Sequence, residues 1–355
     1  MRPHAAANSL HSWRQASSAK ILLAAGAGIA MLLAAGCSSG GGAGTAVSGT
    51  IKIAAEPGIA DAPLWIAAEK GLFTAEGLHV EIVTYGSESA ALNAVETGQA
   101  QIAASDYGNI FGLEQQDSNL RILADGYDTG TGNAEILTLP QANFTNPLKL
   151  QDPTTGAIGL PSDSDIDATL PSGAPTSLLA AAATKVISNY LAGDANTLTW
   201  HAMSQQQELA QLQDGKLKAA LLTEPYVYEA ESEFGASELI DVFSGETANL
   251  PLLGYVATTS WVRNDAAAVD DFQAAIYKAQ ADASMTGPIQ QVLPKLPGSG
   301  INTETADMVS IGTYPTSTST AALQRVTELM YTETMLPRVT AQEGFVTGML
   351  ANSNG

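Results

Sequence analysis

Hydrophobic and polar positions alternate along most of the chain in blocks that predict strands and helices in turn. Positions 79–82 change between polar and apolar at every step, which is the period of a half-buried strand. Shortly before them, Leu64, Ala67 and Ala68 share one helical face, and Gly71 stands where a left-handed helix end belongs. Because strands and helices continue to alternate, the pattern predicts parallel βαβ units and an α/β fold.

The predicted elements form two blocks. Strands are expected over residues 50–55, 78–83, 101–104, 120–124, 135–139, 157–160, 196–200, 217–222, 239–243 and 253–258. Helices are expected over 63–70, 88–97, 107–116, 176–191, 205–213 and 225–234, and the chain from 269 onward is mostly helical. Polar stretches with prolines at 141–155 and 246–251 separate the blocks and predict two crossings of the chain.

The first 36 residues have the three parts of a secretory signal. Arg2, Arg14 and Lys20 precede a short apolar run at 21–35, and small residues then lead to Cys37, the single cysteine of the chain. This ending resembles a bacterial lipobox, so we predict a lipoprotein signal peptide over 1–36, lipidation of Cys37 and a Gly/Ser-rich flexible tether over 37–49. The alternative is an unmodified cysteine in an uncleaved anchor.

Charge narrows the classes of partner. The chain carries 36 acidic and 15 basic side chains, and removal of residues 1–36 leaves 12 basic ones and a net charge of −24. Nucleic-acid binding depends on Lys and Arg that neutralise phosphates, so it is disfavoured. A basic membrane-binding patch is disfavoured for the same reason.

One segment carries a family resemblance. Residues 63–83 read PLWIAAEKGLFTAEGLHVEIV. This segment resembles the N-terminal region of the nitrate/sulfonate/taurine and thiamine-pyrimidine-precursor substrate-binding proteins of ABC importers. The resemblance continues in TGQAQIA (97–103), QDGKLKAA (213–220) and TEPY (223–226). The chain departs from the family at Gln101, where Asp is usual, and at 150–159, which lacks the usual lysines.

The resemblance implies a two-lobed periplasmic-binding-protein-like fold, with a ligand cleft at the hinge. Lobe 1 would comprise 50–140 and 252–355, and lobe 2 would comprise 141–251. It also implies an extracytoplasmic solute receptor, monomeric and anchored by lipid to the outer face of the bacterial cytoplasmic membrane. The receptor would deliver a small organic molecule to an ABC permease with its ATPase.

In open α/β sheets, ligand contacts come from the loops after the carboxyl ends of strands. The residues of these loops that we predict to bind ligand are Pro57, Asp61, Tyr85, Ser87, Glu88, Ser105, Asp106, Tyr107, Tyr127, Ser162, Asp163, Glu224 and Tyr226. Each has a structural alternative. The serines and Asp106 could cap helices, the tyrosines could pack in the core, and Glu224 could simply end a strand.

The proposed loops contain many carboxylates and neither Lys nor Arg. A helix end favours an anion by about 0.3–1 kcal/mol at exposed sites, whereas one carboxylate at about 4 Å repels it by about 4 kcal/mol at an effective dielectric near 20. We therefore expect a neutral or cationic ligand, such as a thiamine-precursor pyrimidine, rather than sulfonate or nitrate.

The sequence shows no motif for a metal, a cofactor or catalysis. Residues 163–167 imitate the start of a calcium loop, but Ala168 and Ala174 replace the required Gly and Glu. No nucleophile elbow or phosphate loop occurs. The expected protein is therefore not an enzyme. Two alternatives remain: a lipoprotein that senses a ligand for a membrane partner, and an exported enzyme with an unrecognised carboxylate pair.

Overall fold

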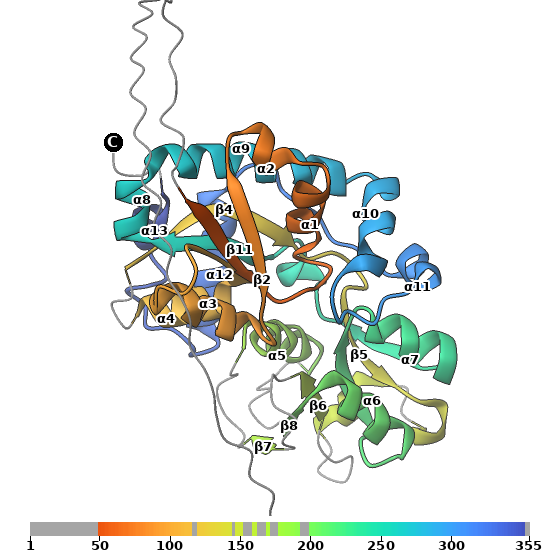
Figure 1. The fold of residues 1–355 in the computed structure, drawn as a ribbon. Coiled ribbons are helices and arrows are strands. Elements are labelled where there is room, and N and C mark those ends of the chain that lie inside the picture. The colour runs from red at the N-terminus through yellow and green to blue at the C-terminus, as the bar shows by residue number, and fades with distance from the viewer. Residues whose placement is uncertain are drawn as a thin grey trace, which may run out of the picture. The chain divides into compact units, whose positions relative to one another are not determined.

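The structure, a computed structural model, describes residues 49–115, 119–143, 146–151, 158–161, 168–170, 177–191 and 199–351. Within them, the chain forms two mixed β-sheets, each flanked by helices (Figure 1). This confirms the predicted two-lobed α/β fold. Among the described residues no helix combines the length and apolarity needed to cross a membrane.

The first sheet has five strands in the order β2-β1-β3-β11-β4. They are β1 Thr50–Ala55, β2 His79–Thr84, β3 Ile102–Asp106, β4 Leu120–Asp128 and β11 Pro251–Thr258. Strand β1 runs parallel to β2 and β3, as predicted. Strand β11 is antiparallel to β3 and β4, because it enters directly from the second sheet without a crossover helix.

The second sheet has six strands in the order β10-β5-β9-β6-β8-β7. They are β5 Ala134–Thr138, β6 Ile158–Pro161, β7 Ala168–Leu170, β8 Trp200–Met203, β9 Ala219–Thr223 and β10 Ser237–Asp241. The sequence places strand 135–139 before the first crossing. In the structure β5 pairs with β9 and β10, so the chain already crosses between β4 and β5.

The helices fall close to the predicted ranges. They are α1 Ala62–Glu69, α2 Leu72–Ala75, α3 Glu88–Glu96, α4 Tyr107–Glu114, α5 Leu178–Leu191, α6 Gln205–Gln213, α7 Tyr226–Phe234, α8 Thr259–Asn264, α9 Ala266–Ala283, α10 Thr286–Val292, α11 Thr303–Met308, α12 Thr320–Thr332 and α13 Glu343–Met349. Gly71 and Gly98 follow α1 and α3 with φ of +66° and +73°, as a left-handed helix end requires.

Apolar side chains join the two sheets through α5. One core lies between the first sheet and helices α1, α9 and α10. A second core contains Phe111 of α4, Ile187 of α5 and Trp200 of β8, so it extends from the helices of the first lobe into the second sheet. In Figure 1, α5 accordingly lies between α4 and strands β6 and β8. A third core lies under α6 and α7.

Candidate functional site

A cavity of about 660 Å³ opens between loops of the two sheets. The first sheet contributes residues 56–61 after β1, Gly86 and Glu88 after β2, and Asp106 and Asn109 after β3. The second sheet contributes residues 204–206 after β8 and 223–226 after β9. These segments follow the carboxyl ends of strands, where open α/β sheets place their ligands. We call this cavity the cleft.

Asp61 lies on the floor of the cleft, immediately before α1. Its side chain is only 1% exposed, and its Oδ1 atom accepts no hydrogen bond. Although Asp61 occupies the N-cap position, its carboxylate does not cap the helix. Burial, followed by the charge of nearby Glu56, raises the pKa of Asp61 well above its usual value.

Three further carboxylates connect the neighbouring loops. Glu56 Oε2 accepts from the backbone N–H of Glu88 at 3.1 Å, and Glu88 Oε2 accepts from the backbone N–H of Asp106 at 2.6 Å. Asp106 in turn caps α4 by accepting from the N–H of Asn109 at 3.0 Å. Burial and the charges of Asp106, Asp61 and Glu56 raise the pKa of Glu88 well above its usual value. Glu56, Asp61, Glu88 and Asp106 are called the carboxyl cluster below.

On the second lobe, the loop after β9 is held by side chains at its two ends. Gln205 Oε1 accepts from the N–H of Thr223 at 2.7 Å. Glu224 accepts from the N–H groups of Ser310 and Tyr228 at 2.8 and 3.1 Å, so it ties β9 to the segment after α11. Burial raises the pKa of Glu224 to about 6, although these two hydrogen bonds oppose the rise.

Asn133 fastens the crossing between β4 and β5 to the same segment. Its Oδ1 accepts from the hydroxyl of Tyr127 at 3.1 Å, and its Nδ2 donates to the carbonyl of Ser310 at 2.8 Å. The N–H of Gly312 donates to the Tyr127 hydroxyl at 2.7 Å. Both Tyr127 and Asn133 line the cleft. The crossing between β4 and β5, which serves as a hinge, therefore forms part of the cleft wall.

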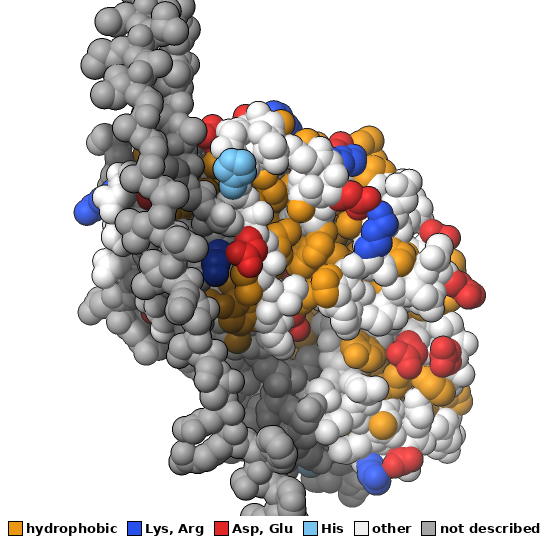
Figure 2. Space-filling view, viewed as in Figure 1, with side chains coloured by type: hydrophobic (Ala, Val, Ile, Leu, Met, Phe, Trp, Pro, Cys, Tyr) orange, Lys and Arg blue, Asp and Glu red, His pale blue; other side chains and the backbone are white. Residues whose placement is uncertain are grey.

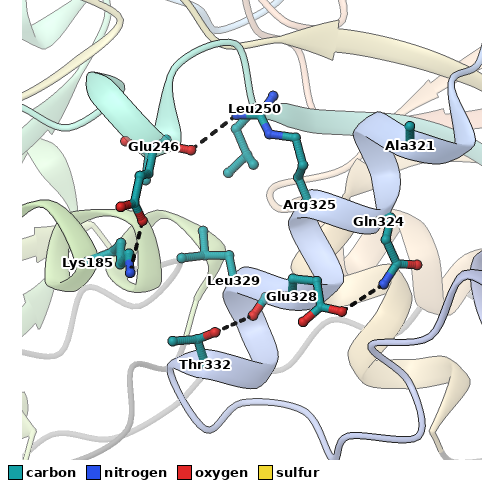
Figure 3. A pocket seen from close by; sticks show the side chains of 10 residues that line it. Lys185, Glu246, Leu250, Ala321, Gln324, Arg325, Glu328, Leu329 and Thr332 are labelled. Atoms are coloured by element: carbon teal, nitrogen blue, oxygen red, sulfur yellow. Dashed lines mark hydrogen bonds and ion pairs between the residues drawn. The ribbon is translucent and has the colours of Figure 1, made fainter.

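A smaller cavity of about 270 Å³ lies behind the return crossing from the second sheet to β11 (Figure 3). Lys185 of α5 forms an ion pair with Glu246 at 3.0 Å. From α12, Arg325 donates to the carbonyls of Glu246, Ala248 and Asn249 at 3.2, 2.7 and 3.1 Å. The return crossing is therefore held from both sides.

Seven of the predicted ligand-binding residues line the cleft: Pro57, Asp61, Glu88, Asp106, Tyr127, Glu224 and Tyr226. Four do not. Ser87 caps α3 by accepting from the N–H of Ala90 at 3.2 Å, and Tyr85 packs beside the core. Ser105 and Tyr107 are fully buried, and the Tyr107 hydroxyl donates to Asp125 at 3.0 Å. Ser162, Asp163 and Cys37 lie outside the described residues.

Sequence reasoning missed several cleft residues. Asn109 lies one turn after Asp106, so helical spacing alone could have found it. Gln205 and Gln206 begin α6 directly after β8, but the sequence ended that strand at residue 200. No ligand-side loop was predicted after this strand, and residues 204–206 were therefore missed. Phe243 and Asn133 carry no signal in the local pattern, because only the crossings bring them to the cleft.

The lining is acidic without a basic counterpart. Among its described residues are five carboxylates and no Lys, Arg or His. All Lys and Arg residues after residue 36 belong to the described part of the chain. Several of them pair at the surface, as Lys70 does with Asp282 at 2.7 Å and Lys295 with Glu69 at 2.6 Å. On the face in Figure 2, acidic and basic side chains are interspersed.

The described residues contain no group of three or more His, Cys, Asp and Glu side chains arranged to hold a metal ion. The carboxyl cluster therefore lacks the geometry of a metal site, despite its four acids. What it offers chemically is a set of hydrogen-bond acceptors and exchangeable protons, of which Asp61 is buried and the other three are half-buried.

Comparison with known proteins supports the fold. Residues 60–170 match the family model "NMT1/THI5 like", which confirms the resemblance carried by residues 63–83. No curated protein matches the chain significantly.

Solved structures with similar folds include the periplasmic aliphatic sulphonate binding protein SsuA from Escherichia coli, with a TM-score of 0.63, 14% identity, and coverage of 85% of this chain and 97% of that one. The periplasmic nitrate-binding protein NrtA from Synechocystis PCC 6803 gives a TM-score of 0.63 at 12% identity, with 86% of each chain covered. The Candida albicans CA3427 gene product, which has the generic periplasmic binding protein fold, gives 0.62 at 12% identity, with 86% of this chain and 95% of that one covered. At these identities the likeness establishes the periplasmic-binding-protein fold.

Proposed function

We propose that this chain is an exported solute receptor that captures a small organic molecule in the cleft and delivers it to an ABC importer. The observation that carries the proposal is a cavity of about 660 Å³ formed by strand-end loops of both sheets. Binding proteins for sulphonate and nitrate share this fold, and residues 60–170 match a family model that agrees with the sequence resemblance. The role that we propose for this fold is capture of a small molecule between the two lobes, and not catalysis.

The ligand we propose is neutral or cationic, such as a thiamine-precursor pyrimidine, rather than a sulfonate or nitrate. The cleft lining has five carboxylates and, among its described residues, no basic side chain. An anion would meet this negative surface without a counter-charge. Tyr226 is half-buried in the lining and supplies aromatic surface that suits a planar ring, whereas the lining residues Tyr127 and Phe243 are buried.

A thermal-shift screen of the purified protein tests both statements. The panel comprises pyrimidines, thiamine, riboflavin, polyamines, taurine, alkanesulfonates and nitrate. A ligand at 100 times its dissociation constant adds about 2.7 kcal/mol of stability, which is a rise of several degrees for a protein of this size. Tight binding of nitrate or an alkanesulfonate, with no response to aminopyrimidines, contradicts the proposed ligand class. Turnover of a bound compound contradicts the receptor role.

The proposed setting is a lipid anchor at Cys37 on the outer face of the cytoplasmic membrane, with an ABC permease and its ATPase as partners. Mass spectrometry of the expressed protein tests the anchor, because Cys37→Ala would abolish the diacylglyceryl mass and leave the protein unattached. Ligand uptake by vesicles that contain the permease would separate transport from sensing. We propose the lobe boundaries of the sequence analysis with one change: β5, which the sequence placed in lobe 1, belongs to lobe 2 because it pairs with β9 and β10.

A further inference from the structure

We infer that the cleft takes up an organic cation, a protonated amine or amidine, in exchange for a proton held by the carboxyl cluster, with Asp61 as the anchoring group. The inference rests on the proposed function, because it names the chemical class of ligand for the same cleft. In the exchange a carboxylic acid releases its proton to solvent, and the resulting carboxylate pairs with the cationic nitrogen. The net charge inside the cleft is therefore unchanged.

Asp61 is placed to bind a ligand, because one of its carboxyl oxygens is buried and accepts no hydrogen bond. Its carboxyl group is buried at the floor of the cavity, and its Oδ1 atom has no hydrogen-bond partner. Two phenols whose pKa values respond to the charge of Asp61 do not donate to it. Tyr314 donates to the carbonyl of Ile59 at 2.6 Å, and the Tyr255 hydroxyl makes no hydrogen bond. A buried acceptor without a donor is costly, so a ligand N–H that reaches Asp61 removes a penalty already present in the empty cleft.

In the part of the chain that the structure describes, no Lys or Arg places a compensating charge in the cleft. Every Lys and Arg after residue 36 lies in the described part of the structure, and none of them lines the cleft. His79 and His201 are also described and lie outside the lining. A ligand cation that enters the cavity therefore displaces no Lys, Arg or His from its described lining. A ligand cation is the missing counter-charge.

Protons take the place of that cation in the empty cleft. The titratable groups that face Asp61 are Glu56, Glu88 and the phenols of Tyr255 and Tyr314. The charge of Asp61 raises the pKa of both phenols, so they stay neutral beside it. Glu88 in turn faces Asp106, Asp61 and Glu56. Burial and these neighbours raise the pKa values of Asp61 and Glu88, so both groups hold a proton more readily than an exposed carboxyl group does.

The exchange has a definite pH signature. A bound cation stabilises the ionised carboxylate, so it lowers the pKa of the group that it contacts and releases a proton. The affinity for the cation then rises with pH, by about tenfold per pH unit for each proton released. A neutral ligand exchanges no proton in the same range, and an anion shows the opposite slope because it favours the protonated cluster.

The test is isothermal titration calorimetry of the full chain in a non-ionic detergent, at pH 6, 7 and 8. At each pH, two buffers with different ionisation enthalpies count the protons released. The cationic probes are thiamine, agmatine, putrescine and spermidine. The neutral probes are cytosine and riboflavin, and the charged controls are taurine, ethanesulfonate and nitrate. We expect at least one cationic probe to bind with release of protons, and to bind more tightly as the pH rises.

Two variants locate the exchange. Asp61→Asn keeps the size of the side chain but cannot ionise, so we expect at least a tenfold loss of cation affinity and a lower proton count. Glu96→Gln is the matched control, because Glu96 is an exposed residue on the same helix as Glu88 and lies outside the lining. Circular dichroism verifies that each variant is folded. The proton count on the unmodified protein stands by itself if Asp61→Asn fails to fold.

Several results overturn the inference. These are binding of a neutral or anionic probe without any cation, cation binding without proton release, unchanged cation binding by Asp61→Asn, and the absence of binding by every cationic probe. The proposed function fails separately. If no probe of any class binds, both the receptor role and the inference lose their support, whereas tight binding of a neutral or anionic probe leaves the receptor role intact.

Discussion

Gly312 is the residue whose lack of a side chain matters most for the hinge. A Cβ atom at this position would collide with the backbone carbonyl of Asp128 and would lie 2.8 Å from Asn133 Oδ1 and 2.9 Å from the Tyr127 ring. Tyr127 and Asp128 end β4, and Asn133 lies just before β5. Tyr127 and Asn133 also make the hydrogen bonds that fasten the crossing between these strands. Close packing of the backbone, rather than an unusual φ, is therefore what requires glycine here.

We expect Gly312→Ala to lower the free energy of unfolding by about 1–3 kcal/mol, the usual cost of overpacking. Urea denaturation measures the change. Gly348→Ala is the matched control, because nothing lies within 4 Å of its added Cβ and the residue is helical. The control should be neutral or stabilising by about 0.5–1 kcal/mol. Equal effects of the two substitutions would show that the hinge tolerates a side chain at position 312.

Glu135 is a buried acidic residue that does not line the cleft. It is 7% exposed on β5, its Oε2 has no hydrogen-bond partner, and burial raises its pKa to about 8. The charges of Glu238, Glu231, Asp241 and Glu224 add to the rise in that order. Because the folded state holds this proton more tightly than the unfolded chain, its contribution to stability is greatest below pH 4.5 and declines as the pH rises to about 8.

Glu135→Gln should therefore stabilise the protein at pH 8 and have little effect at pH 4.5. A pKa shift from 4.5 to about 8 would correspond to about 5 kcal/mol, and local relaxation should leave about 2–4 kcal/mol. Urea unfolding at the two pH values measures the difference, with exposed Glu96→Gln as the control. A variant that gains as much stability at pH 4.5 as at pH 8 contradicts the assigned ionisation.

At the scale of elements, the return crossing from the second sheet is held by helices of both lobes. Arg325 of α12 donates to three of its carbonyls, and Lys185 of α5 pairs with Glu246 (Figure 3). The guanidinium group can make several such bonds at once because its N–H donors lie in a rigid fork. Its charge also counteracts the rise in the pKa of Asp128, which burial brings to about 6.

Removal of the guanidinium should loosen this crossing specifically. For Arg325→Ala we expect a loss of about 1–2 kcal/mol of stability and faster amide hydrogen exchange over residues 245–250. The stability of Arg325→Lys should lie between those of the unmodified protein and Arg325→Ala, because the ammonium group cannot reach three carbonyls together. Arg338→Ala removes an exposed Arg that stacks on Tyr331, so it serves as the control. Unchanged exchange in Arg325→Ala would mean that the crossing does not depend on α12.

The elements that sequence predicted well are those specified by local chemistry. Gly71 and Gly98 mark helix ends because only glycine adopts their positive φ without strain. Strand β4 is the opposite case. The sequence ended it at Ala124, since Asp125 looks like a loop residue, yet the strand continues to Asp128. Asp125 is buried there because the Tyr107 hydroxyl and the side chain of Gln280 bond to it and to its carbonyl.

The residues of the candidate site show the same contrast between those that local sequence predicts and those that long-range packing decides. Loops that follow β1, β2 and β9 could be located from strand and helix boundaries, and they supply Asp61, Glu88 and Glu224. Tyr107 looked equally suitable, but it points into the core, where Gly254 leaves room for its ring. That space depends on antiparallel pairing between β3 and β11, which are far apart in the sequence. Such long-range packing has no local signature.

At the scale of the whole molecule, α5 makes the two lobes one packed body. Its buried face shares a core with α4 and with β8, so neither sheet has an independent apolar interior on that side. Leu178, at its first turn, lies directly against Gly108 of α4, where an added Cβ would be 3.1 Å from the leucine side chain. A shared core of this kind favours cooperative unfolding of both lobes.

We expect a single unfolding transition that both lobes report. Trp200 probes the second sheet, and Trp65 and Trp261 probe the first lobe. The fourth tryptophan, Trp13, lies outside the described residues and is replaced by Phe in every sample. Trp200→Phe and the double variant Trp65→Phe/Trp261→Phe should give fluorescence transitions that each coincide with the transition seen by circular dichroism. Ile187→Ala, which truncates a fully buried side chain of α5, should cost about 2–5 kcal/mol and shift both signals together. Separate midpoints would contradict a shared core.

The hydrogen bonds that link Glu56 to Glu88 and Glu88 to Asp106 make three successive loops of the first lobe depend on one another. A substitution in any of them disturbs the other two, so this half of the cleft resists gradual change. The facing residues Gln206 and Tyr226 begin helices of the second lobe and take no part in that chain of contacts. Divergence toward new cargo should therefore accumulate on the second lobe, while the acidic floor of the first lobe is inherited as a unit.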